Sequence, residues 1–254
     1  MTPELAGAIV IVTGASSGIG AATARRLAKE GATVAVIARR TDRLESLVTE
    51  IERSGGTALA VTADISVRSQ AEASVQTVVD RFRRLDILVN NAGVMLLGPI
   101  VGADVEDWER MLAINVQGLL YVTRAALPHL LSAAADSARG VADVVNISSI
   151  AGRQAWKDFG VYNLTKFGVN GFTESLRQEV TRQHVRVGVL EPGAVDTELE
   201  SHNSDRVKTE VFQPFNERTQ KLEAEDIADG IAFMVTRPRH ASIAELWMMP
   251  TEQA

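Results

Sequence analysis

The stretch Ala8-Ile9-Val10-Ile11-Val12-Thr13-Gly14-Ala15-Ser16-Ser17-Gly18-Ile19-Gly20 decides the fold of this 254-residue chain. The apolar run at 8–12 is typical of a buried strand, and a helical pattern through Leu27 follows the glycines directly. Glycines permit a tight turn and a close backbone approach, and the free amides at a helix start bind anions. The stretch therefore predicts a strand, a turn and a helix that hold a dinucleotide pyrophosphate, although the spacing differs from Gly-x-Gly-x-x-Gly. A tight turn without a ligand is the alternative.

Strand-like and helical patterns alternate along the rest of the sequence. Apolar runs predict further strands at 33–37, 57–61, 87–89, 143–147, 185–190 and 244–249. Apolar stripes predict helices that begin at Thr41 or Asp42 and at 67–83, 105–132 and 160–181. This alternation predicts an α/β protein: a single-domain doubly wound (Rossmann) fold with a seven-stranded parallel sheet. We expect residues 1–254 to form that one NAD(P)-binding domain.

Polar residues at 198–222 interrupt the alternation. Functional loops are often such interruptions, so we expect this segment to be a mobile cover over a substrate. A plain surface excursion is the alternative.

Tyr162 and Lys166 stand four residues apart in Tyr-Asn-Leu-Thr-Lys, so they share one face of the expected helix at 160–181. A phenol has an ordinary pKa of about 10. A nearby ammonium lowers the pKa of a phenol, which makes the group a plausible general acid and base. The pair therefore indicates an enzyme, whereas an ordinary exposed pair is the alternative for these five residues alone.

The end of the second strand bears on the choice of cofactor. An acid at this position would accept hydrogen bonds from an adenosine ribose and repel a 2′-phosphate. The sequence has Ala38 there, followed by Arg39 and Arg40, and guanidinium groups suit phosphates. This favours NADP(H) over NAD(H), and a solvated strand end is the alternative.

The glycine-rich turn and the Tyr-Lys pair together resemble the short-chain dehydrogenase/reductase family over essentially the whole chain. Asn90-Asn91-Ala92-Gly93, Asn115, Ser149 and Pro192-Gly193 fit that family in order and spacing, with Ser149 thirteen residues before Tyr162. Segments 95–99, 124–131 and 250–253 are similar to the NADP-dependent branch that contains clavulanate-pathway aldehyde reductase and serine 3-dehydrogenase.

The resemblance implies an oxidoreductase that interconverts an aldehyde or ketone and its alcohol by hydride transfer. Tyr162 would protonate the carbonyl oxygen, and Lys166 would lower the pKa of Tyr162 and hold the ribose. Ser149 would stabilise the developing alkoxide, and Asn115 would hold a water that connects Lys166 to solvent. A non-catalytic dinucleotide-sensing protein of the same fold is the alternative, and these four intact residues count against it.

The resemblance also implies a set of cofactor contacts. We expect them at Gly14, Ser16, Ser17, Gly18, Ile19, Gly20, Arg39, Arg40, Asp64, Ile65, Asn91, Ala92, Gly93, Tyr162, Lys166, Pro192, Gly193, Val195 and Thr197. Asp64 would contact the adenine, with capping of the next helix as an alternative. Thr197 would meet the nicotinamide carboxamide.

The candidate substrate pocket is mostly apolar. Its expected lining is Met95, Leu96, Arg153, Trp156 and Phe159. Arg153 favours a carbonyl compound that carries an acidic group, whereas the nearby acid Glu191 weakens that idea. The sequence does not identify the substrate, its stereochemistry or the direction of the reaction.

Composition excludes several other functions. The net charge of −6 gives no basic footprint for nucleic acid, and no apolar stretch approaches the roughly 18 residues of a membrane helix. Without cysteine there are no disulfides or thiolate sites, and the four histidines show no spacing typical of a metal site, so we expect no metal. The N-terminus lacks a basic region followed by an apolar core, so we expect a cytoplasmic protein.

The helices at 105–132 and 160–181 carry more apolar surface than one sheet face can cover. We therefore expect a homotetramer, with a dimer as the smaller closed assembly. A thick monomeric core is the alternative.

Overall fold

The computed structural model of the protein describes residues 4–253. Seven strands form one sheet in the order β3-β2-β1-β4-β5-β6-β7, and all neighbouring strands are parallel. The strands are β1 Ile9–Thr13, β2 Thr33–Ala38, β3 Thr57–Thr62, β4 Ile87–Asn90, β5 Ala142–Ile147, β6 Val185–Pro192 and β7 Glu245–Met248. The doubly wound parallel sheet predicted from the sequence is confirmed.

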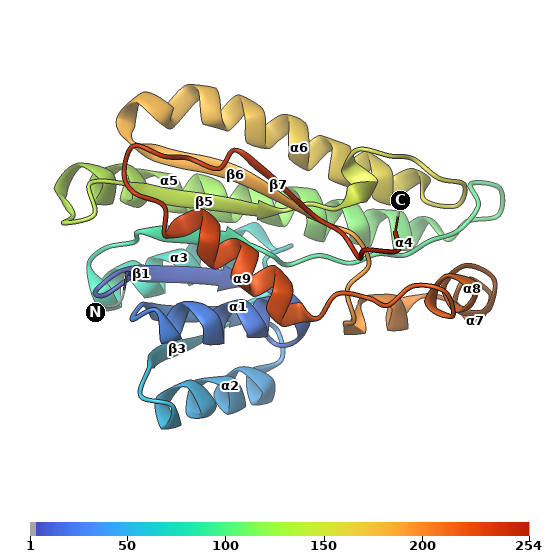
Figure 1. The fold of residues 1–254 in the computed structure, drawn as a ribbon, viewed down its shortest axis with the longest axis horizontal. Coiled ribbons are helices and arrows are strands. Elements are labelled where there is room, and N and C mark those ends of the chain that lie inside the picture. The colour runs from blue at the N-terminus through green and yellow to red at the C-terminus, as the bar shows by residue number, and fades with distance from the viewer. Residues whose placement is uncertain (1–3, 254) are drawn as a thin grey trace.

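Helices cover both faces of the sheet, so its central strands are buried on both sides (Figure 1). One face packs against α1 Gly18–Lys29, α2 Thr41–Arg53 and α9 Ala224–Val235. The other packs against α3 Arg68–Phe82, α5 Leu119–Asp136 and α6 Gly160–Val180. Two apolar layers therefore hold the strands rigidly and fix the loops at their carboxyl ends.

The strand order reverses beside β1, which pairs with β2 on one side and β4 on the other. Ligands of open α/β sheets bind outside the carboxyl ends of the strands at such a switch point. The glycine-rich turn after β1 and Asn91 after β4 meet there, as the sequence pattern requires.

The helix expected at 105–132 is longer than predicted and contains a wider turn. It consists of α4 Val105–Leu112, the π-helical turn η1 Ala113–Gly118, and α5. Asn115 lies in this turn, and π-helical turns often occur at functional sites. The irregular turn was not predicted from the sequence.

The segment 198–222, called the cover segment below, contains short helical turns. They are η4 Glu198–His202, α7 Asp205–Val207, η5 Lys208–Phe212 and α8 Gln213–Asn216. Figure 1 shows α7 and α8 beyond the carboxyl ends of the strands. Val207 and Phe212 are buried, so this segment is packed onto the molecule.

The remaining short turns are η2 Ile150–Gly152 and η3 Thr181–Gln183. Among the helices of residues 4–253, none is long and apolar enough to cross a bilayer.

Candidate active site

A cavity of about 830 Å³ lies at the carboxyl ends of the strands. It brings together most of the residues that the sequence analysis selected. Those that line it are Gly14, Ser16, Ser17, Gly18, Ile19, Arg39, Arg40, Asp64, Ile65, Asn91, Ala92, Gly93, Met95, Ser149, Trp156, Phe159, Tyr162, Lys166, Pro192, Gly193, Val195 and Thr197. This volume falls in the range typical of ligand pockets.

The glycine-rich turn is fastened to the loop after β4. Thr13 Oγ1 accepts hydrogen bonds from the backbone amides of Asn91 at 3.0 Å and Ala92 at 3.1 Å. Asn91 Nδ2 donates to the Thr13 carbonyl oxygen at 2.9 Å. Gly14 has a φ of +66°, and a Cβ there would lie 2.7 Å from Ala92 Cα, so only glycine fits this approach. The turn is thus held rigidly at the mouth of the cavity.

The start of α1 is suited to an anion. Ser17 is the N-cap, its side chain does not bond the helix amides, and the first turn contains no acid. Helix amides attract negative charge, and the Ser16 and Ser17 hydroxyls are placed beside them. The donors at this end of the cavity therefore fit the pyrophosphate of a dinucleotide.

Gly20 and Asn115 do not line the cavity. A Cβ on Gly20 would lie 2.5 Å from both Asn91 Nδ2 and the Gly14 carbonyl oxygen, so this glycine permits packing beneath the turn. The Asn115 carboxamide accepts from Val94 N at 2.8 Å and donates to Val94 O at 2.8 Å. Both residues support the cavity from behind it.

Leu96 and Arg153 also lie outside the cavity lining, which corrects their placement in the substrate pocket. Leu96 is buried in an apolar cluster with Met111. Arg153 Nε bonds the buried carboxylate of Glu191 at 2.8 Å, and its Nη2 pairs with Glu245. Because the guanidinium is already paired with these acids on β6 and β7, it does not support the prediction of a substrate that carries an acidic group.

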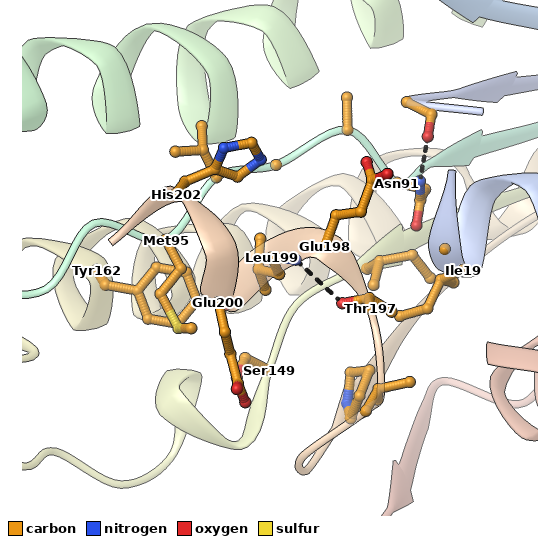
Figure 2. Close-up of a pocket in the computed structure, with 18 of the residues that line it drawn as sticks. Ile19, Asn91, Met95, Ser149, Tyr162, Thr197, Glu198, Leu199, Glu200 and His202 are labelled. Carbon is orange, nitrogen blue, oxygen red and sulfur yellow. Dashed lines mark hydrogen bonds between the residues drawn. The ribbon is translucent and has the colours of Figure 1, made fainter. Parts of the chain in front are cut away.

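Three aromatic rings form one wall beside the candidate acid. The Trp156 and Phe159 ring centroids lie 5.5 Å apart, and those of Phe159 and Tyr162 lie 6.5 Å apart, both edge to face. Met95 lies against Tyr162 in Figure 2. Tyr162 itself is buried, so the phenol lies in largely apolar surroundings.

The Lys166 side chain extends toward the end of β5 in the sheet. Its Nζ donates to the carbonyl oxygen of Ile147, the last residue of β5, at 3.0 Å. It lies 5.7 Å from the centroid of the Tyr162 ring. Ser149 follows β5 directly and its Oγ accepts from Ala151 N at 3.1 Å, which fixes the hydroxyl at the start of η2.

Burial controls the proton affinities of this pair. It raises the pKa of the Tyr162 phenol to about 12, against the smaller lowering effect of the Ser149 side chain. It lowers the pKa of the Lys166 ammonium to about 8. The expected lowering of the Tyr162 pKa by Lys166 is therefore not seen in this structure, because loss of hydration is the largest cause and only the Ser149 side chain opposes it.

Arg39 and Arg40 follow β2 and line the cavity at the end opposite Tyr162. Arg40 Nη2 donates to Ser17 Oγ at 2.7 Å, and Arg40 Nε donates to Ser16 Oγ at 3.0 Å. Arg39 Nη1 lies 3.9 Å from Asp64 Oδ2. The Asp64 carboxylate also accepts from the backbone amide and hydroxyl of Ser66, so a local turn is one of its roles. Arg40 is already directed at the glycine-rich turn.

Several lining residues were not predicted individually, among them Glu198, which lies in the segment expected to cover the substrate, and Gln253. Glu198 bonds Arg40 across the mouth of the cavity. Gln253 Oε1 accepts from Ala194 N at 2.8 Å and so holds the loop that follows β6. Both contacts join distant parts of the chain, and no local pattern signals them.

A family model described as short chain dehydrogenase matches residues 8–208. The chain belongs to the short-chain dehydrogenase/reductase family. An uncharacterized oxidoreductase of Staphylococcus epidermidis is 34% identical over 242 residues, which cover 95% of this chain and 96% of that protein.

Solved structures of the family superpose over nearly the whole molecule. The closed form of a serine dehydrogenase complexed with NADP+ has a TM-score of 0.87 and 35% identity, over 97% of this chain and 96% of that one. A 3-ketoacyl-(acyl-carrier-protein) reductase from Brucella melitensis complexed with NADH has a TM-score of 0.85 and 29% identity, over 98% and 100%. This short-chain dehydrogenase/reductase is therefore an oxidoreductase whose cofactor is a nicotinamide dinucleotide.

Proposed function

We propose that the protein is an NADP-dependent oxidoreductase that interconverts an aldehyde or ketone and its alcohol, with Tyr162 as the general acid and base. One observation carries the proposal. A single cavity joins the anion-binding start of α1 and Arg40 to Tyr162, Ser149 and Lys166. Such a cavity can hold a long dinucleotide with its reactive end beside a proton donor.

A bound nicotinamide supplies or accepts the hydride, and the side chains handle the proton. The Tyr162 phenol is protonated at neutral pH because burial raises its pKa, so it can donate a proton to a carbonyl oxygen. The Ser149 hydroxyl, fixed after β5, can hydrogen-bond the same oxygen as negative charge develops. The Nζ of Lys166 donates to the Ile147 carbonyl oxygen, and in this position it can also hold the ribose hydroxyls of the cofactor.

The choice of NADP rests on the end of β2. Ala38 offers no carboxylate to a ribose hydroxyl, and Arg39 and Arg40 both line the cavity. Arg40 lies within hydrogen-bond distance of the two serines of the glycine-rich turn, so a 2′-phosphate bound there would meet a guanidinium and two hydroxyls.

A cofactor-consumption assay tests the proposal. Mixed aldehydes and ketones are offered with NADPH and NADH side by side, and oxidation is followed by absorbance. We expect turnover with a higher kcat/KM for NADPH. Turnover with a preference for NADH would contradict the cofactor assignment, and tight NADPH binding without turnover on any carbonyl would favour a dinucleotide-sensing protein.

We also propose that the protein is a homotetramer that works in the cytoplasm. Large apolar side chains remain exposed on two neighbouring helical regions, Val105 and Leu120 on α4 and α5, and Leu164 and Phe167 on α6. Covering such faces by two-fold contacts is the usual closed arrangement. The chain has no cysteine, so its fold does not depend on disulfides or on an oxidising compartment, which is compatible with the cytoplasm.

A further inference from the structure

The carboxylate of Glu198 lies between two arginines, of which Arg40 lines the cavity and Arg43 does not. Glu198 Oε2 accepts from Arg40 Nη1 at 2.9 Å, and Glu198 Oε1 accepts from Arg43 Nη1 at 3.1 Å. Glu198 begins the cover segment, whereas Arg40 and Arg43 belong to the start of α2. Figure 2 shows Glu198 and Glu200 pointing to opposite sides of η4. Glu200 pairs instead with Lys221 within the cover segment.

Close packing holds the start of the cover segment against the glycine-rich turn. A Cβ on Gly18 would lie 3.0 Å from Thr197 Cγ2, so the Gly18 backbone packs closely against the Thr197 side chain. Thr197 Oγ1 caps η4 by accepting from Leu199 N at 3.3 Å (Figure 2). The packing of Thr197 on one side of Glu198 and the capped turn η4 on the other therefore hold Glu198 near Arg40.

Each of the three side-chain nitrogens of Arg40 donates a hydrogen bond in this arrangement. Its Nε and Nη2 donate to Ser16 and Ser17, and its Nη1 donates to Glu198. Hydrogen bonding to Arg40 is the largest cause that lowers the pKa of the Glu198 carboxyl, so this group is ionised at neutral pH. An anion that approaches Arg40 meets the charge of the Glu198 carboxylate, and it can accept from more than the second N–H of Nη1 only by displacing Glu198 or a serine.

We propose that Glu198 is an internal competitor of the adenosine 2′-phosphate for Arg40, so that it lowers the preference for NADPH over NADH. This inference rests on the proposed function, which assigns Arg40 to that phosphate. Arg43 gives Glu198 a second partner, so the carboxylate stays paired when Arg40 turns to the phosphate. Glu198 is thus a specificity-determining residue that ties cofactor choice to the cover segment.

A different role for the same carboxylate makes the opposite prediction. A carboxylate near the adenosine could accept hydrogen bonds from the ribose hydroxyls and favour NADH directly. Removing its charge would then weaken NADH and leave the 2′-phosphate unaffected. The two roles are therefore separated by which ligand responds.

The test measures binding, not turnover. Glu198→Gln keeps the shape and removes the charge, and calorimetry gives Kd for adenosine 2′,5′-bisphosphate and adenosine 5′-monophosphate. Release of Arg40 from its exposed ion pair and removal of one like-charge repulsion should lower Kd for the bisphosphate about three- to tenfold. The monophosphate should change less than about twofold, and the gain should shrink at high salt because screening weakens exposed charges.

Two further variants show whether Glu198 acts through Arg40. Glu210→Gln removes an acid from the same cover segment whose partner is Arg206 at 2.9 Å, outside the cavity, and should leave both affinities unchanged. In an Arg40→Gln background, Glu198→Gln should no longer improve bisphosphate binding. An equal gain in that background would mean that Glu198 acts generally on charge, and the proposal would be wrong.

The inference and the proposed function fail in different ways. A wild-type protein that binds NADH more tightly than NADPH contradicts the cofactor assignment, while a bisphosphate gain in Glu198→Gln still supports competition for Arg40. A wild-type preference for NADPH with no bisphosphate gain in Glu198→Gln contradicts the competition alone. Weakened monophosphate binding in Glu198→Gln also overturns it, in favour of the ribose-accepting role.

Discussion

Lys166→Met should remove a pH-dependent contribution to the unfolding free energy. The lowered pKa of Lys166 sets the size of this contribution. Burial lowers the pKa of Lys166 from 10.5 to about 8 in the folded protein, and the unfolded chain restores the ordinary value. Between these values the unfolded state binds a proton that the folded state has released. Stability therefore rises with pH across this window.

The size of the effect follows from the shift in pKa. One pKa unit corresponds to about 1.4 kcal/mol, so the shift predicts a rise on the order of 2 to 3 kcal/mol between pH 7 and pH 10. Methionine has a similar shape and no charge, so the variant should lack this rise. Loss of the hydrogen bond to Ile147 changes stability by an amount that does not depend on pH.

The assay is urea unfolding followed by circular dichroism at pH 7, 8, 9 and 10 without nicotinamide dinucleotide. The quantity of interest is the unfolding free energy of the wild type minus that of Lys166→Met, because pH effects at other groups cancel. Lys29→Met, which removes an exposed lysine of α1, controls for the lost charge. A difference that stays constant with pH within about 0.5 kcal/mol would refute the lowered pKa of Lys166.

Three other variants probe the packing, the cofactor end and the assembly. Asn115→Ala leaves the buried Val94 amide without its acceptor and should lower the unfolding free energy by about 2 to 4 kcal/mol, whereas a loss below about 1 kcal/mol in urea unfolding would contradict its bracing role. Arg39→Ala should weaken NADPH binding by about 1.5 to 3 kcal/mol with little change for NADH, and fluorescence titration would expose an equal effect on both. Phe167→Glu places a charge on the exposed face of α6 and should reduce a tetramer of 27.3 kDa chains to smaller species in light scattering, while a wild-type monomer would contradict the tetramer itself.

The sheet and its catalytic end could be predicted because their signals are local. Strands such as Ile9–Thr13 are continuous apolar runs, the glycines of the turn follow directly, and Tyr162 and Lys166 share one helix face through their spacing alone. The strand limits from the sequence differ from those of the structure by at most two residues. These features depend on neighbours along the chain.

The helix α9 was missed although its signal is present. Glu223 and Asp226 form a reciprocal capping box, and Ile227 and Ile231 follow at helical spacing. The polar cover segment directly precedes this helix, and the regular pattern after it was therefore overlooked. This box uses Glu and Asp in place of the usual Ser or Thr followed by Glu or Gln, so the helical spacing of the apolar residues was the clearer signal.

The placement of Arg153 could not be predicted because long-range pairing decides it. Glu191 becomes fully buried through the pairing of β6 with β7, which sets it beside Trp247 in register. A buried carboxylate requires a cationic partner, and Arg153 is within reach. The pKa of Tyr162 is another such case, since its burial depends on residues from several separate elements.

The central claim, proton transfer by Tyr162 next to a bound nicotinamide, is tested most directly by Tyr162→Phe. The change removes only the hydroxyl, so NADPH affinity measured by fluorescence titration should remain within about threefold. With an aldehyde or ketone that the wild type reduces, kcat should fall by about 10² to 10⁴, the range for loss of a general acid. Intact NADPH binding with wild-type kcat would contradict the account.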